Sequence, residues 1–168
     1  TRDIVDALKR FSAVDRAGGE QVDLNEVVER AVRWVAQSAP AHFALAIDLP
    51  PGLRCSGSSG QLQQVVMNLV QNACDALAGR QDPSLTVTGG VDGGMATLRF
   101  VDNGPGIPAE HLDHLFEPFF TTKPVGQGTG LGLSISYSIV DRHGGHLSVA
   151  NRPQGGVEFT LTLPLESR

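Results

Sequence analysis

Residues Gln64–Ala76, with the sequence QVVMNLVQNACDA, have the pattern of a long amphipathic helix, which we predict over about residues 61–78. A helix turns by about 100° per residue, so Asn68, Asn72 and Asp75 fall within roughly 60° of one another beside the apolar face. Asparagine is a poor helix former, so the presence of two asparagines one turn apart in a helix needs an explanation. Either this stripe is a solvated polar edge, or it lines a pocket with amides and a carboxylate.

The sequence on either side of this helix predicts an α/β domain. Asp23 is typical of an N-cap, and the helix that follows it stops before Pro40. Apolar residues recur at helical spacing in three further places, at about 4–14, 109–115 and 131–142. Alternating or short apolar runs predict strands from Val22 and at about 43–49, 85–91, 96–101, 146–150 and 157–163, with Asp92-Gly93-Gly94 as a hairpin turn.

The sequence DNGPGI, Asp102–Ile107, follows directly after an apolar strand. A carboxylate at a strand end can accept a hydrogen bond from an exocyclic amine, and glycines let a planar ring approach the backbone. The same residues could instead form an ordinary turn in which the Asp side chain bonds nearby backbone.

A second glycine-rich stretch, GQGTGLGL, covers Gly126–Leu133 and leads into a helix. Free N–H groups and the helix dipole at such a position favour a phosphate. The stretch is no Walker A loop, because no Lys-Ser/Thr pair follows the glycines, and it lacks the spacing and preceding strand of a dinucleotide-binding turn. A flexible hinge is the alternative.

Taken together, these motifs resemble the catalytic, ATP-binding domain of sensor histidine kinases, in the GHKL ATPase superfamily. The resemblance covers about residues 20–165. Four stretches resemble the family's boxes: the N box at Gln64–Ala76, the G1 box at Asp102–Ile107, the F box at Phe116–Lys123 (FEPFFTTK) and the G2 box at Gly128–Ser134 (GTGLGLS). Two closing segments also match, His143–His146 (HGGH) and Gly155–Thr160 (GGVEFT).

The resemblance implies a Bergerat-type α/β fold, a two-layer sandwich in which a mixed sheet is covered by three main helices. A long ATP lid would occupy residues 108–127. Residues 1–18 would be the tail of a helical hairpin that dimerises and carries the phosphoacceptor, and residues 19–168 the catalytic ATP-binding domain. Thr1 is not a natural start, so we expect the chain to be part of a longer protein.

The resemblance also implies roles for individual residues. Asn72 would be the Mg²⁺ ligand and Asp102 the adenine reader, assisted by the hydroxyl of Thr160. Asn68 and Lys123 would serve the phosphate side and the catalysis. The full expected nucleotide site comprises Asn68, Asn72, Asp75, Ala76, Asp102, Gly104, Gly106, Ile107, Thr121, Thr122, Lys123, Gly128, Thr129, Gly130, Leu131, Gly132, Leu133 and Thr160.

The implied activity is transfer of the γ-phosphate of MgATP to a histidine of the dimerisation domain, and onward to an aspartate of a response regulator. None of the chain's own histidines lies in a helix of the acceptor type, so we expect the acceptor to be absent here. A GHKL-type ATP hydrolase or clamp is one alternative; however, those with a helix-borne base carry Glu one turn before the metal-binding Asn, where this chain has Asn68. A non-catalytic nucleotide sensor is another. His111 and His114 lie three residues apart and could bind a metal together with His143, but no third ligand has a suggestive spacing.

Composition and charge restrict the class of protein. The chain has 168 residues, 40% of them hydrophobic and 18% charged, which fits one soluble domain. Its net charge of −5 argues against nucleic-acid or membrane binding, and two cysteines form no disulfide framework. The lack of a disulfide framework makes a cytoplasmic setting the default, and Cys74 is expected to be a small buried residue. The resemblance implies a homodimeric parent, of which this chain would be a monomeric fragment.

Overall fold

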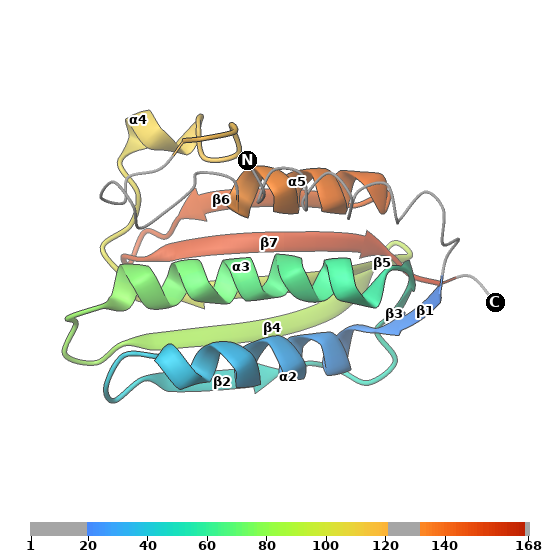
Figure 1. The fold of residues 1–168 in the computed structure, drawn as a ribbon, viewed down its shortest axis with the longest axis horizontal. Coiled ribbons are helices and arrows are strands. Elements are labelled where there is room, and N and C mark those ends of the chain that lie inside the picture. Colours follow the sequence, from blue (N-terminus) through green and yellow to red (C-terminus); the bar gives the residue numbers. More distant parts are fainter. Residues whose placement is uncertain (1–19, 121–131, 167–168) are drawn as a thin grey trace.

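A computed structural model describes residues 20–120 and 132–166 of the chain (Figure 1). The predicted N-terminal helix and the 1–18 hairpin tail lie outside these residues, as do the positions from Thr121 to Leu131 of the predicted lid and G2 box.

The centre of the fold is a five-stranded mixed sheet. Its strand order is β2-β4-β5-β7-β6, in which β2 and β4 are parallel and all other neighbours antiparallel. A separate antiparallel pair joins β1 and β3. In chain order the strands are β1 (Glu20–Asp23), β2 (Ala44–Asp48), β3 (Arg54–Gly57), β4 (Ser84–Asp92), β5 (Met95–Asp102), β6 (His146–Asn151) and β7 (Val157–Pro164).

The three main helices lie side by side over one face of this sheet, with the central one between the other two (Figure 1). They are α2 (Leu24–Val35), α3 (Ser59–Leu77) and α5 (Gly132–Arg142). A single 3₁₀ turn, η1 (Ala36–Ser38), follows α2, and a one-turn helix, α4 (Ala109–Leu112), follows β5. This arrangement confirms the α/β two-layer sandwich and its mixed sheet.

The core lies between the sheet and the helices. In β5 the buried side chains are every second residue, from Ala96 to Asp102, and in β7 every second residue from Val157 to Leu163. Successive side chains of a strand point to opposite faces, so these residues pack under the helices. Asp102 is the one charged residue in this row, which marks the end of β5 as a special position.

Local sequence accounts for the helix starts and the main hairpin. Asp23 caps α2 by accepting the N–H of Asn25 at 2.9 Å, as its residue type predicted. Ser58 caps α3 by accepting the N–H of Gln61 at 3.3 Å. The β4–β5 hairpin turns at Gly93 and Gly94, whose φ values of 60° and 80° favour glycine.

Two features of the sheet differ from the sequence-based expectation. Strand β3 was not predicted, because Arg54–Gly57 has one buried apolar side chain, Cys55, among polar neighbours. The alternating pattern at 43–49 is typical of a half-buried strand, but four of the five residues of β2 are exposed, and β2 forms an edge of the sheet.

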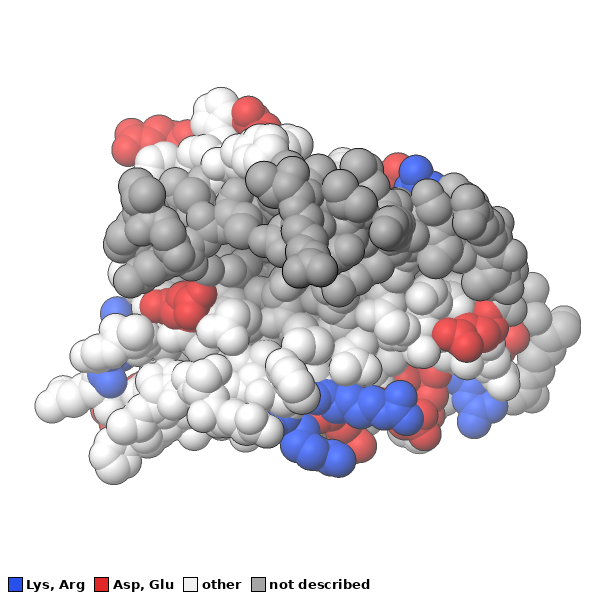
Figure 2. Space-filling model, viewed as in Figure 1, with Lys and Arg blue, Asp and Glu red and all other residues white. Residues whose placement is uncertain are grey.

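Charges on the helix-covered face are mixed. Figure 2 shows Lys and Arg side chains along the edge formed by α2, with carboxylates beside them. Arg30 and Glu26 form one such pair on α2 at 3.7 Å; both are exposed, so the pair contributes little to stability.

Candidate nucleotide site

The G1 turn begins at a buried carboxylate. Asp102 is 6% exposed and is the last residue of β5. Its Oδ1 accepts the backbone N–H of Gly104 at 2.8 Å and that of Val157 at 3.2 Å. One oxygen of the carboxylate is therefore engaged in holding the turn, which leaves Oδ2 as the acceptor for a ligand.

Burial raises the pKa of Asp102 above its ordinary value. The N–H groups of Gly104 and Val157 act in the opposite direction, as do the positive charges of Arg152 and Arg80. The site thus holds a carboxylate in a dry environment with compensating donors and cations, as expected of a group that receives a hydrogen bond from a ligand.

The N box helix packs against this turn. A Cβ placed on Gly104 would lie 3.6 Å from the Cβ of Ala76 near the end of α3, so the two boxes are in contact there. Asp75, beside Ala76, is exposed and accepts the side-chain amide of Gln71 at 3.0 Å. The end of α3, the helix that carries the expected polar stripe, and the G1 turn are therefore neighbours.

Asn68 joins α3 to the start of α5. Its Nδ2 donates to the carbonyl of Gly132 at 3.1 Å and to the hydroxyl of Ser136 at 3.0 Å. Ser136 is fully buried, and Asn72, one turn further along α3, is half-buried on the same face. Asn68 thus connects the N box to the last glycine of the predicted G2 box; Leu133 follows on α5 and packs against the core.

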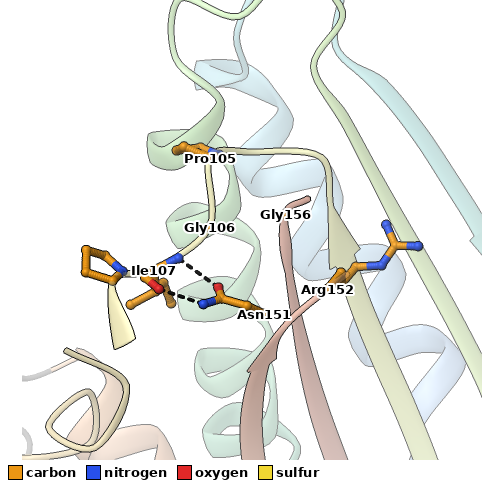
Figure 3. A pocket seen from close by; sticks show the side chains of 7 residues that line it. Pro105, Gly106, Ile107, Asn151, Arg152 and Gly156 are labelled. Carbon is orange, nitrogen blue, oxygen red and sulfur yellow. Dashed lines mark hydrogen bonds between the residues drawn. The ribbon is translucent and has the colours of Figure 1, made fainter. Parts of the chain in front are cut away.

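A second anchor holds the far end of the G1 turn. The Oδ1 of Asn151, at the end of β6, accepts the N–H of Ile107 at 2.8 Å, and its Nδ2 donates to the carbonyl of Ile107 at 2.6 Å (Figure 3). Gly106, just before Ile107, has φ +85°. Sequence reasoning missed Asn151, since a polar residue just before the turn at 152–156 gives no sign of so specific a contact.

A pocket of about 620 Å³ lies beside this contact (Figure 3). Neither Asp102 nor any α3 residue lines it, so it borders the expected base site from outside. Its walls are Pro105, Gly106, Ile107, Pro108, Asn151, Arg152 and Gly156.

Asn103 anchors the near end of the turn in a similar way. Its Oδ1 accepts the N–H of Ser84 at 2.8 Å and its Nδ2 donates to the carbonyl of Asp82 at 2.6 Å. The turn is therefore tied by one side-chain amide to the loop that precedes β4 and by another to the end of β6.

Thr160 does not lie beside Asp102. Its register partner in β5 is Arg99, whereas the β7 residue that meets Asp102 is Val157, three positions earlier. Val157, Phe159 and Leu161 are buried under the helices, so the side chain of Thr160 belongs to the opposite face of the sheet. This placement does not support a role for Thr160 at the adenine. Thr160 was expected there because its hydroxyl is near the closing glycines in sequence, and the sequence did not show which face of the strand carries it.

Part of the expected site falls outside the described residues. These positions are Thr121, Thr122, Lys123, Gly128, Thr129, Gly130 and Leu131.

Two of the histidines, His143 and His114, have structural partners. His143 donates from Nδ1 to the carbonyl of Ile139 at 2.7 Å and accepts the N–H of Ser58 on Nε2 at 3.1 Å, so both ring nitrogens are used. His114 pairs with Glu117. Within residues 20–120 and 132–166 no group of three or more His, Cys, Asp or Glu could hold a metal, and the three-histidine site is not formed there.

Comparison with known proteins gives the family. The family described as "Histidine kinase-, DNA gyrase B-, and HSP90-like ATPase" matches residues 57–167. The chain belongs to this family. The C4-dicarboxylate transport sensor protein DctB of Rhizobium meliloti (strain 1021) is 38% identical over 90% of the chain, and the sensor histidine kinase ZraS of Escherichia coli (strain K12) is 36% identical over 87%. The chain spans 24% and 31% of these relatives.

A solved structure supports the same placement. The mycobacterial sensor histidine kinase MprB superposes with a TM-score of 0.78 at 30% identity, covering 89% of this chain and 99% of that one. The chain is thus a histidine-kinase-type ATPase domain of the sensor kinases, as its motifs indicated. In the part of the chain that the structure describes, no helix is long and apolar enough to cross a membrane.

Proposed function

We propose that this domain binds MgATP and transfers the γ-phosphate to a histidine on a helical-hairpin dimerisation domain of its parent kinase. The observation that carries the proposal is the buried Asp102, held through Oδ1 by two backbone N–H groups beside the helix of Asn68 and Asn72. The family and the sensor-kinase relatives support it.

Asp102 would select adenine. Its free Oδ2 can accept the exocyclic amine of adenine but would face the carbonyl of guanine, acceptor against acceptor. Because the carboxylate is buried, an unpaired or mismatched ligand group there is costly, and the site should reject the wrong base.

Asn72 would contribute an amide oxygen to Mg²⁺, and the residues present fit that ion. Mg²⁺ usually keeps several waters and takes phosphate oxygens, so it needs few protein ligands. The half-buried Asn72, on the α3 face that carries Asn68, suits such a site, and no competing carboxylate or histidine cluster exists among the described residues. Lys123 and the glycines Gly128, Gly130 and Gly132, with Thr129, would hold the phosphates, and Leu131 and Ile107 would flank the base.

The transfer would form a bond between phosphorus and a histidine nitrogen as the bond from the γ-phosphorus to the bridging oxygen of ADP breaks. The domain's part would be positioning and charge neutralisation rather than covalent chemistry. An aspartate of a response regulator would then take the phosphoryl group. Residues 1–18 would be the tail of the hairpin, in a homodimeric parent, and this domain would be cytoplasmic.

The test mixes this chain, labelled ATP and the parent's hairpin domain. We expect label on the hairpin histidine, stable in base and lost in acid, with no label on this chain. Intrinsic hydrolysis should be slow because Asn68 stands where a general base would be required. Tight ATP binding with rapid hydrolysis would favour the hydrolase alternative, and binding with neither reaction would favour a nucleotide sensor.

A further inference from the structure

We infer that Asn151 is a positioning residue of the nucleotide site, which fixes Ile107 as the wall of the base pocket. This inference rests on the proposed function. It starts from a side-chain amide that meets both polar backbone atoms of one residue 44 positions away in sequence, at 2.8 and 2.6 Å (Figure 3).

The G1 turn has few other means of holding Ile107. Pro105 and Pro108 have no backbone N–H, so Gly104, Gly106 and Ile107 supply the donors of residues 104–108. Asp102 takes the first of these and Asn151 the last. The carbonyl of Ile107 is also bonded to Asn151, so one side chain fixes the orientation of that whole residue.

The backbone at Gly106 lies close to this contact. Gly106 has φ +85°, and a Cβ there would lie 3.1 Å from the Oδ1 of Asn151. Ile107 then packs against the core from a half-buried position. Asp102 at one end of the turn and Ile107 at the other are therefore held at a set separation, which an adenine ring between them requires.

The two hydrogen bonds to Ile107 require the amide of Asn151, because one needs an acceptor and the other a donor. A carboxylate of the same shape could still accept from the N–H of Ile107, but it would oppose the carbonyl of Ile107, acceptor against acceptor. Alanine would remove both bonds. If Asn151 only filled space at the end of β6, Asn151→Asp would behave like the unmodified chain.

The experiment measures MgADP, MgATP and MgGTP affinity by calorimetry for the whole chain and for Asn151→Ala and Asn151→Asp. We expect both variants to bind MgADP about tenfold more weakly. Asn151→Ala loses both hydrogen bonds that order the pocket, and Asn151→Asp replaces one of them with two opposed acceptors. The preference for ATP over GTP should fall as well, because a loose wall discriminates less. The matched control is Asn25→Ala on α2, which loses one amide-to-backbone bond, to Pro50, far along the chain from the site and should bind unchanged.

A second measurement separates positioning from stability. In an Ile107→Ala background, Asn151→Ala should cost much less affinity, because the residue through which it acts is already truncated. If Asn151→Ala does not fold, Asn151→Asp and Asn151→Ser carry the test. Folded Asn151 variants with unchanged affinity and base preference, or full additivity with Ile107→Ala, would overturn the inference alone. Failure of the unmodified chain to bind MgADP would overturn the proposed function and this inference together.

Discussion

The side chain of Asp102 accepts the backbone N–H of Val157 at 3.2 Å, and this bond ties the end of β5 to the start of β7. The same oxygen also accepts from Gly104. The carboxylate therefore has two functions, since Oδ1 holds the turn while the negative charge serves the expected ligand. These functions can be separated, because an amide oxygen would satisfy the turn equally well.

Asp102→Asn should weaken MgATP binding severely while leaving the unliganded fold as stable as before, or more so. Burial raises the pKa of Asp102, so its charged form is disfavoured in the folded state and its contribution to stability falls as pH rises from the unfolded pKa through the folded one. The variant's advantage in thermal melts should thus be largest at neutral pH and shrink on acidification, as the native carboxyl takes up its proton. A variant that melts well below the unmodified chain at neutral pH would contradict this account.

Gly156 and Gly155 offer a matched pair of substitutions in the β6–β7 turn. Both have positive φ, +89° and +105°, so alanine strains the backbone at either by about 1–3 kcal/mol. A Cβ on Gly156 would also lie 2.0 Å from the carbonyl oxygen of Asp102, whereas a Cβ on Gly155 meets nothing within 4 Å. Urea unfolding should show a clearly larger loss for Gly156→Ala, together with lost nucleotide binding. Equal losses in the two variants would contradict the close approach.

The elements that sequence predicted correctly are those with a strong local signal. The amphipathic period of α3, the cap at Asp23 and the glycine pair at Gly93-Gly94 each specify structure within a few residues. The sheet order and the β1–β3 pair depend on contacts between distant segments, and nothing in the short polar run Arg54–Gly57 indicates its partner.

The site divides in the same way. Asp102 was a candidate because its carboxylate follows an apolar strand and precedes glycines, which is a local pattern. Asn151 and Val157 reach the site through strand pairing, and Thr160 was misplaced because a shift of three residues changes both the position along a strand and its face. Resemblance to a family supplied the roles, but it could not supply the residues that hold the motif in place.

Gln61→Met should stabilise the domain. Gln61 is 4% exposed in the first turn of α3, and neither of its side-chain polar atoms has a hydrogen-bond partner among the described residues. A buried unsatisfied amide costs about 1–3 kcal/mol, so an apolar side chain of similar shape should raise the free energy of unfolding by about 1–2 kcal/mol. The comparison is Gln63→Met, at a half-buried position on the same helix, for which a change within about 0.5 kcal/mol is expected. A lower unfolding midpoint for Gln61→Met would show that the amide is satisfied in solution, for example by water.

Asn68 and Asn72 should respond differently to alanine although they lie one turn apart on α3. Asn68→Ala removes the donor for the Gly132 carbonyl and leaves the hydroxyl of Ser136 buried without that partner. The free energy of unfolding should therefore fall by about 1–3 kcal/mol, and nucleotide affinity should fall too, since α5 begins at Gly132.

Asn72→Ala should leave the denaturation midpoint within error but reduce MgADP affinity severely, because its amide is proposed to meet the metal. Calorimetry with and without Mg²⁺ checks the second point, as the variant should lose most of the difference between the two conditions. An Asn72→Ala variant that still gains affinity from Mg²⁺ like the unmodified chain would remove Asn72 from the metal site, and an Asn68→Ala variant of unchanged stability would show that its contacts with α5 contribute little to the fold.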